Sequence, residues 1–599
     1  MLTMSLTDSG SDHGSSWLSD RWPVILLSVC WAVVAYWINP ERNVPLNDDW
    51  SYALSVEALL RTHTLRLTDW QSATLVVQLF WGALFCLFFG FSITVLHLST
   101  LTLSVAGIFG LHGLLRHLGG DRRVATLGAA VLAFNPYYIH LSHSFMTDIA
   151  GLTLMVWSML LLLRGLDSDR NGEIAAGLIV ALLATFVRQL GLMVFIAFAV
   201  AYPIRRGFDR RWLLLAVLPT ILAAGALSAF ERFLIHIGEL PGLYHAKSKD
   251  VKAVIGDLLH FRLGALRNPI YVTFQLLIYV GLACLPFSLM MVSSALGRFT
   301  PSGRKLALGG VIAFTVALTF GLSLVGKIMP IASNLLNDPG LGLRSLPGIL
   351  PPAPRAYWMV WTALAVLGMS LTLPILFAYA RDLWLRRAEI TQPESEQEAE
   401  GRFQLWHLVF LAIVTVLCYG PMAFSYAPFF DRYTLVFLPL LLAILVSLGA
   451  GRPACMSFPC GWMGLAILLA FAGFGIVATR DYLAWNQIRW EAAERFQKER
   501  GLAPEEIDAG FEYNNFHASR ARIQGEWIHK PGDDGLVNRS SLRNRLAFQP
   551  LPDHEIVSEV ECHPWLPFGI KRIYLLTRKA DTSASPKPEP SAPAAAEGR

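Results

Sequence analysis

The fold is decided by residues 22–52, WPVILLSVCWAVVAYWINPERNVPLNDDWSY, where an apolar run is followed by two adjacent carboxylates. The run Trp22–Ile38 is close to the length that crosses the hydrocarbon of a bilayer. Asp48 and Asp49 follow a few residues later, where a membrane helix would meet water. Charged groups next to hydrocarbon are costly and are usually kept for a function. We therefore expect this acidic pair to lie at the reacting centre.

The composition of the chain excludes a single water-soluble globule. Of its 599 residues, 54% are hydrophobic and only 16% are charged, and the mean hydropathy is +0.46. The net charge of +5 is small for this length and does not favour a nucleic-acid partner. The seven cysteines form neither a disulfide framework nor a metal-binding spacing. These features predict a polytopic membrane protein surrounded by lipid.

Apolar runs of about 17 to 25 residues predict thirteen membrane-spanning helices, hence a mainly α bundle. They begin near Trp22, Ser92, Val124, Ile149, Ile174, Leu190, Trp212, Pro269, Leu306, Ala356, Leu405, Tyr433 and Trp462. The predicted organisation is a disordered cytoplasmic tail (1–20), a transmembrane domain (21–479) whose outer loop 39–91 carries interfacial helices, a small outer α/β domain (480–580) and a disordered tail (581–599).

The last 120 residues differ in character from the bundle. Residues 481–500 are amphipathic and end at Gly501, which predicts a helix. The alternating runs 555–560 and 572–577 predict two strands. Together they indicate a compact domain outside the membrane.

Basic residues predict the sidedness. With a cytoplasmic N-terminus in the cell inner membrane, most of the arginine-rich loops fall on the cytoplasmic side, as the positive-inside rule requires. One segment, 73–89, is apolar enough to span, and counting it would reverse the assignment. Gln78 and the amphipathic flanks favour an interfacial position for this segment. The acidic pair is then on the outer face.

A purely structural explanation of Asp48 stays open from spacing alone. Asp is a preferred helix cap, and Tyr52, Val56 and Leu59 follow with helical periodicity, so Asp48 can simply begin a short amphipathic helix. Likewise, Asp431-Arg432-Tyr433 can be an ordinary ion-paired helix start with an interfacial aromatic.

Several short motifs occur in a characteristic order over the first 210 residues. They are Asp48-Asp49-x-x-Tyr52, Phe89-Gly90, His117-Leu118-Gly119, Asn135-Pro136 and Ser144-Phe145-Met146-Thr147-Asp148. In this order they resemble the GT-C membrane glycosyltransferases, as in the aminoarabinose transferase and protein mannosyltransferase group. The order of the motifs carries more weight than any one of them.

The resemblance implies roles for individual residues. Asp48 matches the proposed catalytic base, Asp49 the acidic residue after it, and Asp148 the second acid of the site. Arg188, Arg344 and Arg432 are candidates, by location only, for binding the donor phosphate. Further candidates for the substrate pocket are Tyr52, His143 and Tyr433.

The resemblance also implies a reaction. A sugar would move from a polyprenyl-phosphate donor to a glycan, lipid or protein acceptor on the outer face, with inversion expected. A carboxylate can accept the proton of the attacking group, and the leaving phosphate needs positive charge. No cofactor is certain, but Asp48 and Asp148 can also share a divalent cation, for which oxygen ligands favour Mg²⁺ or Mn²⁺.

Two alternatives from other classes are a multi-pass transporter and a non-catalytic lipid-binding scaffold. The chain shows no clear internal repeat and few ionisable residues at mid-membrane depth, where a carrier would place its site.

The Gly/Pro-rich segment 326–355 is predicted to act as a lid over the donor.

Overall fold

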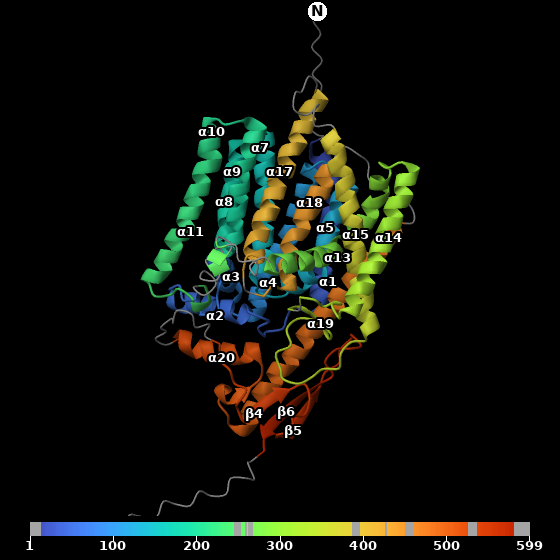
Figure 1. The fold of residues 1–599 in the computed structure, drawn as a ribbon. Coiled ribbons are helices and arrows are strands. Elements are labelled where there is room, and N and C mark those ends of the chain that lie inside the picture. The colour runs from blue at the N-terminus through green and yellow to red at the C-terminus, as the bar shows by residue number, and fades with distance from the viewer. Residues whose placement is uncertain are drawn as a thin grey trace, which may run out of the picture.

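The computed structural model describes residues 13–244, 253–254, 256–257, 260, 267–332, 334–385, 396–425, 428–449, 460–524 and 536–579. Residues 1–12 of the predicted tail 1–20, and the whole of the predicted tail 581–599, lie outside these residues. The first helix begins at His13, inside the segment expected to be disordered. The described chain forms a helical bundle with a small mixed domain at one end (Figure 1).

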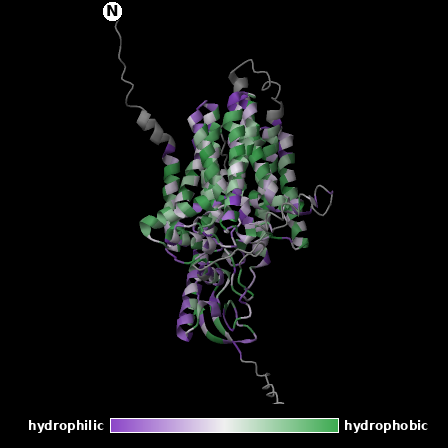
Figure 2. Cartoon of the chain, turned by 90° about the vertical axis from the view of Figure 1, so that its left-hand side faces the viewer, coloured by the Kyte–Doolittle hydropathy of each residue, from purple (hydrophilic) through white to green (hydrophobic). Residues whose placement is uncertain are grey.

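The bundle contains most of the helices. Its elements are α1 (His13–Trp37), α4 (Ile93–His117), α5 (Arg122–Ala133), α6 (Pro136–Ser142), α7 (Thr147–Asp167), α8 (Asn171–Val187), η1 (Gln189–Gly191), α9 (Leu192–Arg206), α10 (Arg210–Trp212), η2 (Leu213–Val217), α11 (Leu218–His236), α13 (Arg267–Leu296), α14 (Pro301–Leu324), α15 (Arg355–Leu385), α17 (Glu396–Ala423), η4 (Asp431–Val436), α18 (Phe437–Gly449) and α19 (Cys460–Arg500). Apolar residues dominate the middle of the bundle, and polar residues lie at both of its ends and in the small domain (Figure 2).

Ten helices of the described chain are long and apolar enough to cross a membrane, and the bent pair α5–α6 makes an eleventh if it counts as one span. Each of the thirteen predicted runs coincides with a helix or with this pair, but Arg21–Trp37 of α1 and the whole of α8 fall below the length required of a span. Helix α3 (Val76–Phe89) has only 14 residues, which is short of the roughly 20 that a span needs. This length agrees with the interfacial position expected for 73–89.

The break between α5 and α6 has a local cause. Pro136 has no N–H to donate, so the helical hydrogen bonding cannot run through it. Asn135 instead caps α6, because its side-chain oxygen accepts from the backbone N–H groups of Tyr137 and Tyr138 at 2.9 and 3.4 Å. The two helices meet at a bend of 62°. The chain therefore turns here, shortly before α7 begins.

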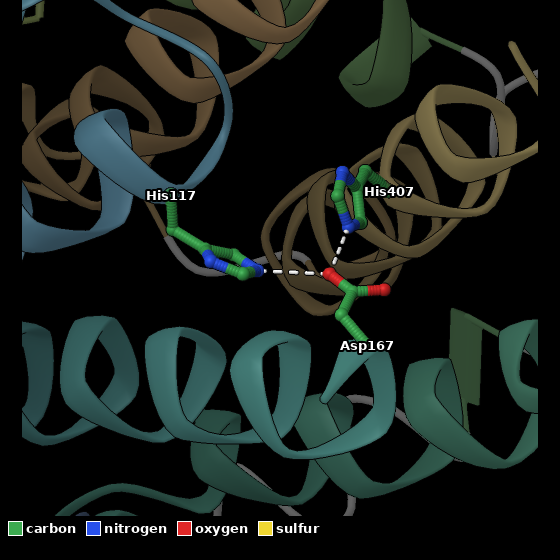
Figure 3. Close-up of side chains that lie close together, drawn as sticks. All are labelled: His117, Asp167 and His407. Atoms are coloured by element: carbon green, nitrogen blue, oxygen red, sulfur yellow. Dashed lines mark hydrogen bonds and ion pairs between the residues drawn. The ribbon is translucent and has the colours of Figure 1, made fainter. Parts of the chain in front are cut away.

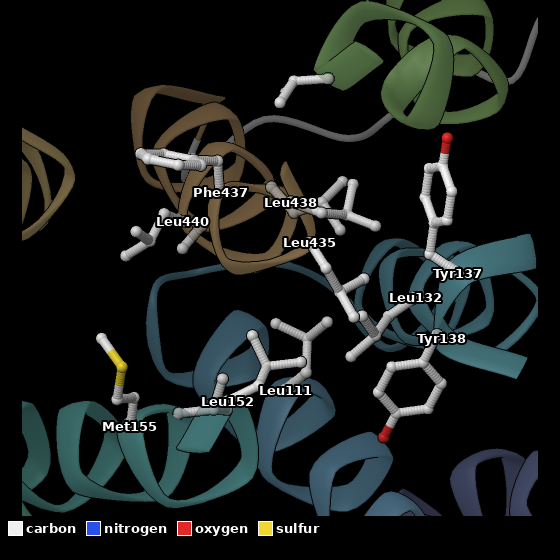
Figure 4. Packing of buried hydrophobic residues seen from close by; sticks show 14 of the residues in the cluster. Leu111, Leu132, Tyr137, Tyr138, Leu152, Met155, Leu435, Phe437, Leu438 and Leu440 are labelled. Atoms are coloured by element: carbon white, nitrogen blue, oxygen red, sulfur yellow. The ribbon is translucent and has the colours of Figure 1, made fainter. Parts of the chain in front are cut away.

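Side chains from many helices meet in one apolar core. Leu111 of α4, Leu132 of α5 and Leu152 of α7 lie in it close to Leu435 and Leu438, while Tyr137 and Tyr138 point to opposite sides of α6 (Figure 4). Elsewhere α13 and α15 approach so closely at Gly281 and Gly368 that a Cβ on either would meet the backbone of the other helix. Small residues permit this contact, as in many membrane helix pairs.

The remaining elements lie at the end of the bundle that carries the small domain. They are α2 (Asp49–Thr62), α3, β1 (Leu336–Asn337), β2 (Gly340–Leu341), η5 (Pro504–Glu506), β3 (Ile507–Asp508), α20 (Phe511–Gln524), β4 (Asn544–Ala547), β5 (His554–Glu561) and β6 (Arg572–Arg578). Helix α2 packs against α20, which joins the segment after α1 to the small domain (Figure 1).

The small domain contains a four-stranded sheet in the order β3-β4-β6-β5. Strand β3 pairs with β4 in parallel, and the other pairs are antiparallel, with Leu546 opposite Leu575 and Val560 opposite Ile573. The two strands predicted from alternation are β5 and β6, so that prediction is confirmed.

Helix α19 runs without interruption from the bundle into the small domain, although the sequence suggested a change of element near Arg480. Asp481 on this helix accepts from the backbone N–H groups of Trp565 and Leu566 at 2.8 Å each. Further along, Arg489 forms an ion pair of 2.9 Å with Glu512 of α20, and both side chains are fully buried. These contacts fix the sheet and α20 to α19.

His517 of α20 makes the stability of the small domain depend on pH. Its ring lies against Trp490 and Tyr513, and burial lowers its pKa from 6.5 to about 4, with Arg539 and Arg520 adding to the effect. The folded domain therefore favours the neutral imidazole. As the pH falls from 6.5 towards 4, the unfolded chain takes up a proton that the folded chain does not, so stability is complete above 6.5 and is lost below it.

We expect the thermal midpoint of the small domain to fall between pH 7 and pH 5, and the His517→Gln variant to show a weaker fall. Tryptophan fluorescence of the purified protein measures this, since Trp490 contacts the ring. His563→Gln is the control because His563 is exposed and should leave the dependence as it is. Equal pH dependence in wild type and His517→Gln would contradict the assignment.

Candidate functional site

Asp48 does not cap helix α2. It occupies the N-cap position, but its side chain makes no capping hydrogen bond. Its carboxylate instead accepts from Trp70 Nε1 at 2.9 Å and pairs with Arg432 Nη2 at 3.0 Å. Arg432 lies 384 residues away in η4. The structural explanation of Asp48 as a simple cap is therefore wrong.

Asp148 forms a second acid–arginine pair beside the first. It lies in the first turn of α7, and its Oδ1 is 2.6 Å from Nη1 of Arg188, which ends α8. The stem of Arg188 lies against Gly151, where an added Cβ would be 3.4 Å from its Cδ. The guanidinium groups of Arg188 and Arg432 lie 5.8 and 5.7 Å from the ring centre of Tyr433. Tyr433 thus joins the two pairs.

A cavity opens at the Asp148–Arg188 pair and beside Arg432. Asp148, Arg188, Arg432 and Tyr433 form its polar part. The rest is lined by Gly151, Leu152, Met155, Leu190, Met422, Leu435 and Val436. An amphiphile with an anionic head and an apolar tail matches this division of polar and apolar surface.

Buried polar atoms without partners mark the polar part of the cavity. In the described part of the chain, Nε and Nη1 of Arg432 and Oδ2 of Asp148 are buried and have no hydrogen-bond partner. A buried polar group left unpaired is costly, and Arg can bind an oxyanion with two parallel N–H groups. Arg432 therefore has donors available to a ligand beyond its pair with Asp48.

Tyr52 lies in the same electrostatic neighbourhood. Burial raises the pKa of its hydroxyl, and the Asp48 carboxylate raises it further, while Arg432 and Arg188 act in the opposite direction. The hydroxyl stays protonated at neutral pH and can donate a hydrogen bond. The structure thus brings together Asp48, Asp148, Arg188, Arg432, Tyr433 and Tyr52.

Asp49 has a different environment from its neighbour. Its Oδ1 accepts from the N–H of Leu46 at 2.6 Å, and its Oδ2 contacts His97 Nε2 at 2.8 Å and the N–H of Phe145 at 3.1 Å. Burial raises the pKa of Asp49, and the hydrogen bond with His97 opposes that rise. The fully buried carboxylate holds the start of α2 to α4 and to the segment before α7.

Two other candidates lie apart from the cavity. Both ring nitrogens of His143 face backbone oxygens, those of Ile139 at 2.8 Å and Ala35 at 3.3 Å. Arg344 is 3.7 Å from Asp338 and lines another cavity, beside α19 and the small domain. The structure does not bring either residue to the Asp48–Arg432 pair.

Asp431 also departs from the expected helix start. Its carboxylate accepts from the backbone N–H groups of Leu335 and Leu336 at 3.0 and 2.8 Å, so it is no surface partner of Arg432. These bonds fix part of the segment 326–355 beside η4. The proposed movement of this segment as a lid stays a prediction.

Sequence reasoning missed Trp70 and His97, which hold Asp48 and Asp49. Trp70 stands in a polar stretch of the loop 39–91, and its only signal is that it is an aromatic residue in the same loop as the acidic motif. His97 is a lone imidazole in an apolar run. A buried imidazole usually needs a hydrogen-bond partner, so its presence signals that such a partner exists. Neither feature identifies the partner.

The fold and this cavity define a membrane-embedded protein with paired carboxylates and arginines at one end of a helical bundle. Residues 72–236, less than half of the chain, match the family model described as dolichyl-phosphate-mannose-protein mannosyltransferase. This match confirms the resemblance to GT-C membrane glycosyltransferases. No curated protein matches the chain.

Solved structures with some similarity include two of ArnT from Cupriavidus metallidurans. The form bound to undecaprenyl phosphate has 13% identity and a TM-score of 0.40, and covers 95% of this chain and 100% of that one. The apo form has 13% identity and a TM-score of 0.38, over 93% and 98%. An Archaeoglobus fulgidus oligosaccharyltransferase tethered to an acceptor peptide has 14% identity and a TM-score of 0.29, over 69% of this chain and 56% of that one.

We expect His97→Ala to destabilise the protein, because the buried carboxylate of Asp49 loses its imidazole partner and keeps only the N–H groups of Leu46 and Phe145. Breaking a buried pair of this kind costs about 3–5 kcal/mol. A lower thermal midpoint of the purified protein in detergent measures the effect. His236→Ala, at the exposed end of α11, is the control and should leave the midpoint nearly unchanged. A wild-type midpoint in His97→Ala would show that the contact contributes little.

Proposed function

We propose that the protein transfers a sugar from a polyprenyl-phosphate donor to an acceptor hydroxyl or amine, at the outer face of the cell inner membrane. The observation that carries the proposal is the cavity that combines two arginines, the Asp148 carboxylate and an apolar wall, with the Asp48 carboxylate paired to one of those arginines, Arg432. The family match over residues 72–236 supports the reaction class. The positive-inside pattern of the loops supports the outer face.

The cavity suits the donor because its two surfaces match the two parts of a lipid phosphate. Arg432 and Arg188 would bind the phosphate, with the free Nε and Nη1 of Arg432 as donors. Leu152, Met155 and Val436 offer an apolar surface to the first isoprene units. Binding of this kind keeps the lipid in the bilayer and the sugar at the polar end.

Asp48 is the proposed general base. The acceptor oxygen or nitrogen forms a bond to the anomeric carbon while the bond from that carbon to the phosphate oxygen breaks, and the acceptor proton passes to Asp48. Trp70 and Arg432 hold the carboxylate in position. The departing polyprenyl phosphate carries negative charge, which Arg432 and Arg188 stabilise. Attack from the side opposite the leaving group inverts the anomeric centre.

Asp148 and Asp49 have positioning roles in this proposal. Asp148 orients Arg188 through the bond of 2.6 Å. Asp49 holds the beginning of α2, the helix that follows Asp48 directly. A divalent cation shared by Asp48 and Asp148 fits poorly, because each carboxylate already contacts a guanidinium group. We therefore derive no step that uses Mg²⁺ or Mn²⁺.

Incubation of the purified protein with labelled polyprenyl-phosphate sugars tests the proposal. Transfer of the sugar to an acceptor lipid, glycan or peptide, or slow hydrolysis of the donor, is the expected result. Flux into proteoliposomes without any chemistry would instead establish a transporter. Donor binding with neither chemistry nor flux would establish a scaffold, and either outcome would overturn the enzyme.

We expect Asp48→Asn to lower the turnover rate by about 10²–10⁴-fold, because the amide cannot accept the acceptor proton. Asn keeps the size of the side chain and can still accept from Trp70, so the thermal midpoint serves to check folding. Asp553→Asn, an exposed acid of the small domain, is the control and should turn over normally. A folded Asp48→Asn protein with near-normal turnover would remove the proposed base.

We expect Asp148→Asn to raise the KM for the donor and to lower turnover, because Arg188 loses the carboxylate that orients it. Initial rates at varied donor concentration separate the two effects, and Asp553→Asn again provides the comparison. Unchanged kinetics for Asp148→Asn would show that its pair with Arg188 serves only the fold.

A further inference from the structure

A second polar cluster lies at the opposite end of the bundle from the small domain. His117 is the last residue of α4, Asp167 the last of α7, and His407 lies in α17. The two imidazole rings converge on the carboxylate from different helices (Figure 3). Asp148 and Asp167 stand at the two ends of α7, about 28 Å apart at 1.5 Å per residue. The cluster is therefore remote from the proposed reaction.

The ligand atoms of the cluster are close enough to share one ion. Oδ2 of Asp167 is 2.8 Å from His117 Nε2 and 2.7 Å from His407 Nε2, and the three ligand atoms all lie within 4.8 Å of one another. In a tetrahedral zinc site with bonds of about 2.0–2.1 Å, neighbouring ligand atoms are about 3.3 Å apart. If each imidazole Nε2 moves about half an ångström away from Asp167 Oδ2, the two distances reach this value.

The surroundings hold the carboxylate in a suitable orientation. Oδ1 of Asp167 accepts from Trp406 Nε1 at 2.9 Å and is 3.6 Å from Nε of Arg205, so the second oxygen is left facing the two imidazoles. Partners of this kind orient metal-binding carboxylates in known sites. The side chains of Asp167 and His407 are 4% and 2% exposed, while that of His117 is 18% exposed. The His117 side gives an ion and a water molecule access.

We propose that His117, Asp167 and His407 bind one divalent transition-metal ion of the zinc class, with water as a fourth ligand. Two imidazole nitrogens and a carboxylate oxygen are a donor set that suits Zn²⁺ and does not suit Mg²⁺ or Ca²⁺. Each neutral imidazole then carries its proton on Nδ1 and coordinates through Nε2. The ion ties α4, α7 and α17 together and is a structural element, independent of the proposed transfer.

Metal content and binding test this proposal on the full-length protein. We expect the wild-type protein, purified without chelator, to contain about one zinc per chain by elemental analysis. His407→Gln and Asp167→Asn should each lower that content at least tenfold. His236→Gln, an exposed histidine outside the cluster, should retain it. Zinc in wild type no higher than in His407→Gln would overturn the site.

A second measurement does not depend on the folding of any variant. Chelator-treated wild-type protein should take up one equivalent of Zn²⁺ in a saturable titration and gain thermal stability. Co²⁺ in its place should give the absorption bands of a four-coordinate site. A hydrogen-bonded cluster without metal function would bind neither ion stoichiometrically, and that result would overturn the proposal whatever the variants show.

Discussion

The pair between Asp48 and Arg432 is the interaction on which the site depends. A carboxylate and a guanidinium group at the edge of a hydrophobic bundle are tolerated only when each is neutralised by a partner. Here that requirement joins the beginning of α2 to η4, which are 384 residues apart in sequence. The pair of Asp148 with Arg188 satisfies the same requirement between α7 and α8. Because both pairs meet at Tyr433, the helix ends that carry them are fixed relative to one cavity.

The helices were predictable because hydrophobic length is a local signal. Each apolar run formed a helix or, in the case of α5 and α6, a bent pair of helices, and the strands β5 and β6 appeared where alternation placed them. Boundaries were less predictable, since nothing in residues 475–485 shows that α19 continues through Arg480. The helix is continuous because Asp481 and Arg489 find partners in the small domain. Such partners are distant in sequence and leave no local pattern.

The site was predictable in its residue types more than in its pairings. Asp48, Asp148, Arg188 and Arg432 are brought together, and their placement beside predicted helix ends was the available signal. Only the family resemblance separated Asp48 from Asp49, and the residue pattern did not show that Asp48 faces Arg432 while Asp49 turns towards His97. Arg344 was chosen only because it lies in a predicted outer loop. Its ion pair with Asp338, six residues earlier, is local and did not indicate that Arg344 lines a different cavity. Tertiary contacts decide these cases.

The length of α19 has a mechanical consequence. At 1.5 Å per residue its 41 residues form a rod of about 60 Å, half in the bundle and half under the sheet. A rod without a hinge transmits rotation from one end to the other. The small domain must therefore tilt whenever the bundle half of α19 tilts, and a small change in that angle becomes a larger lateral displacement of the sheet at the far end.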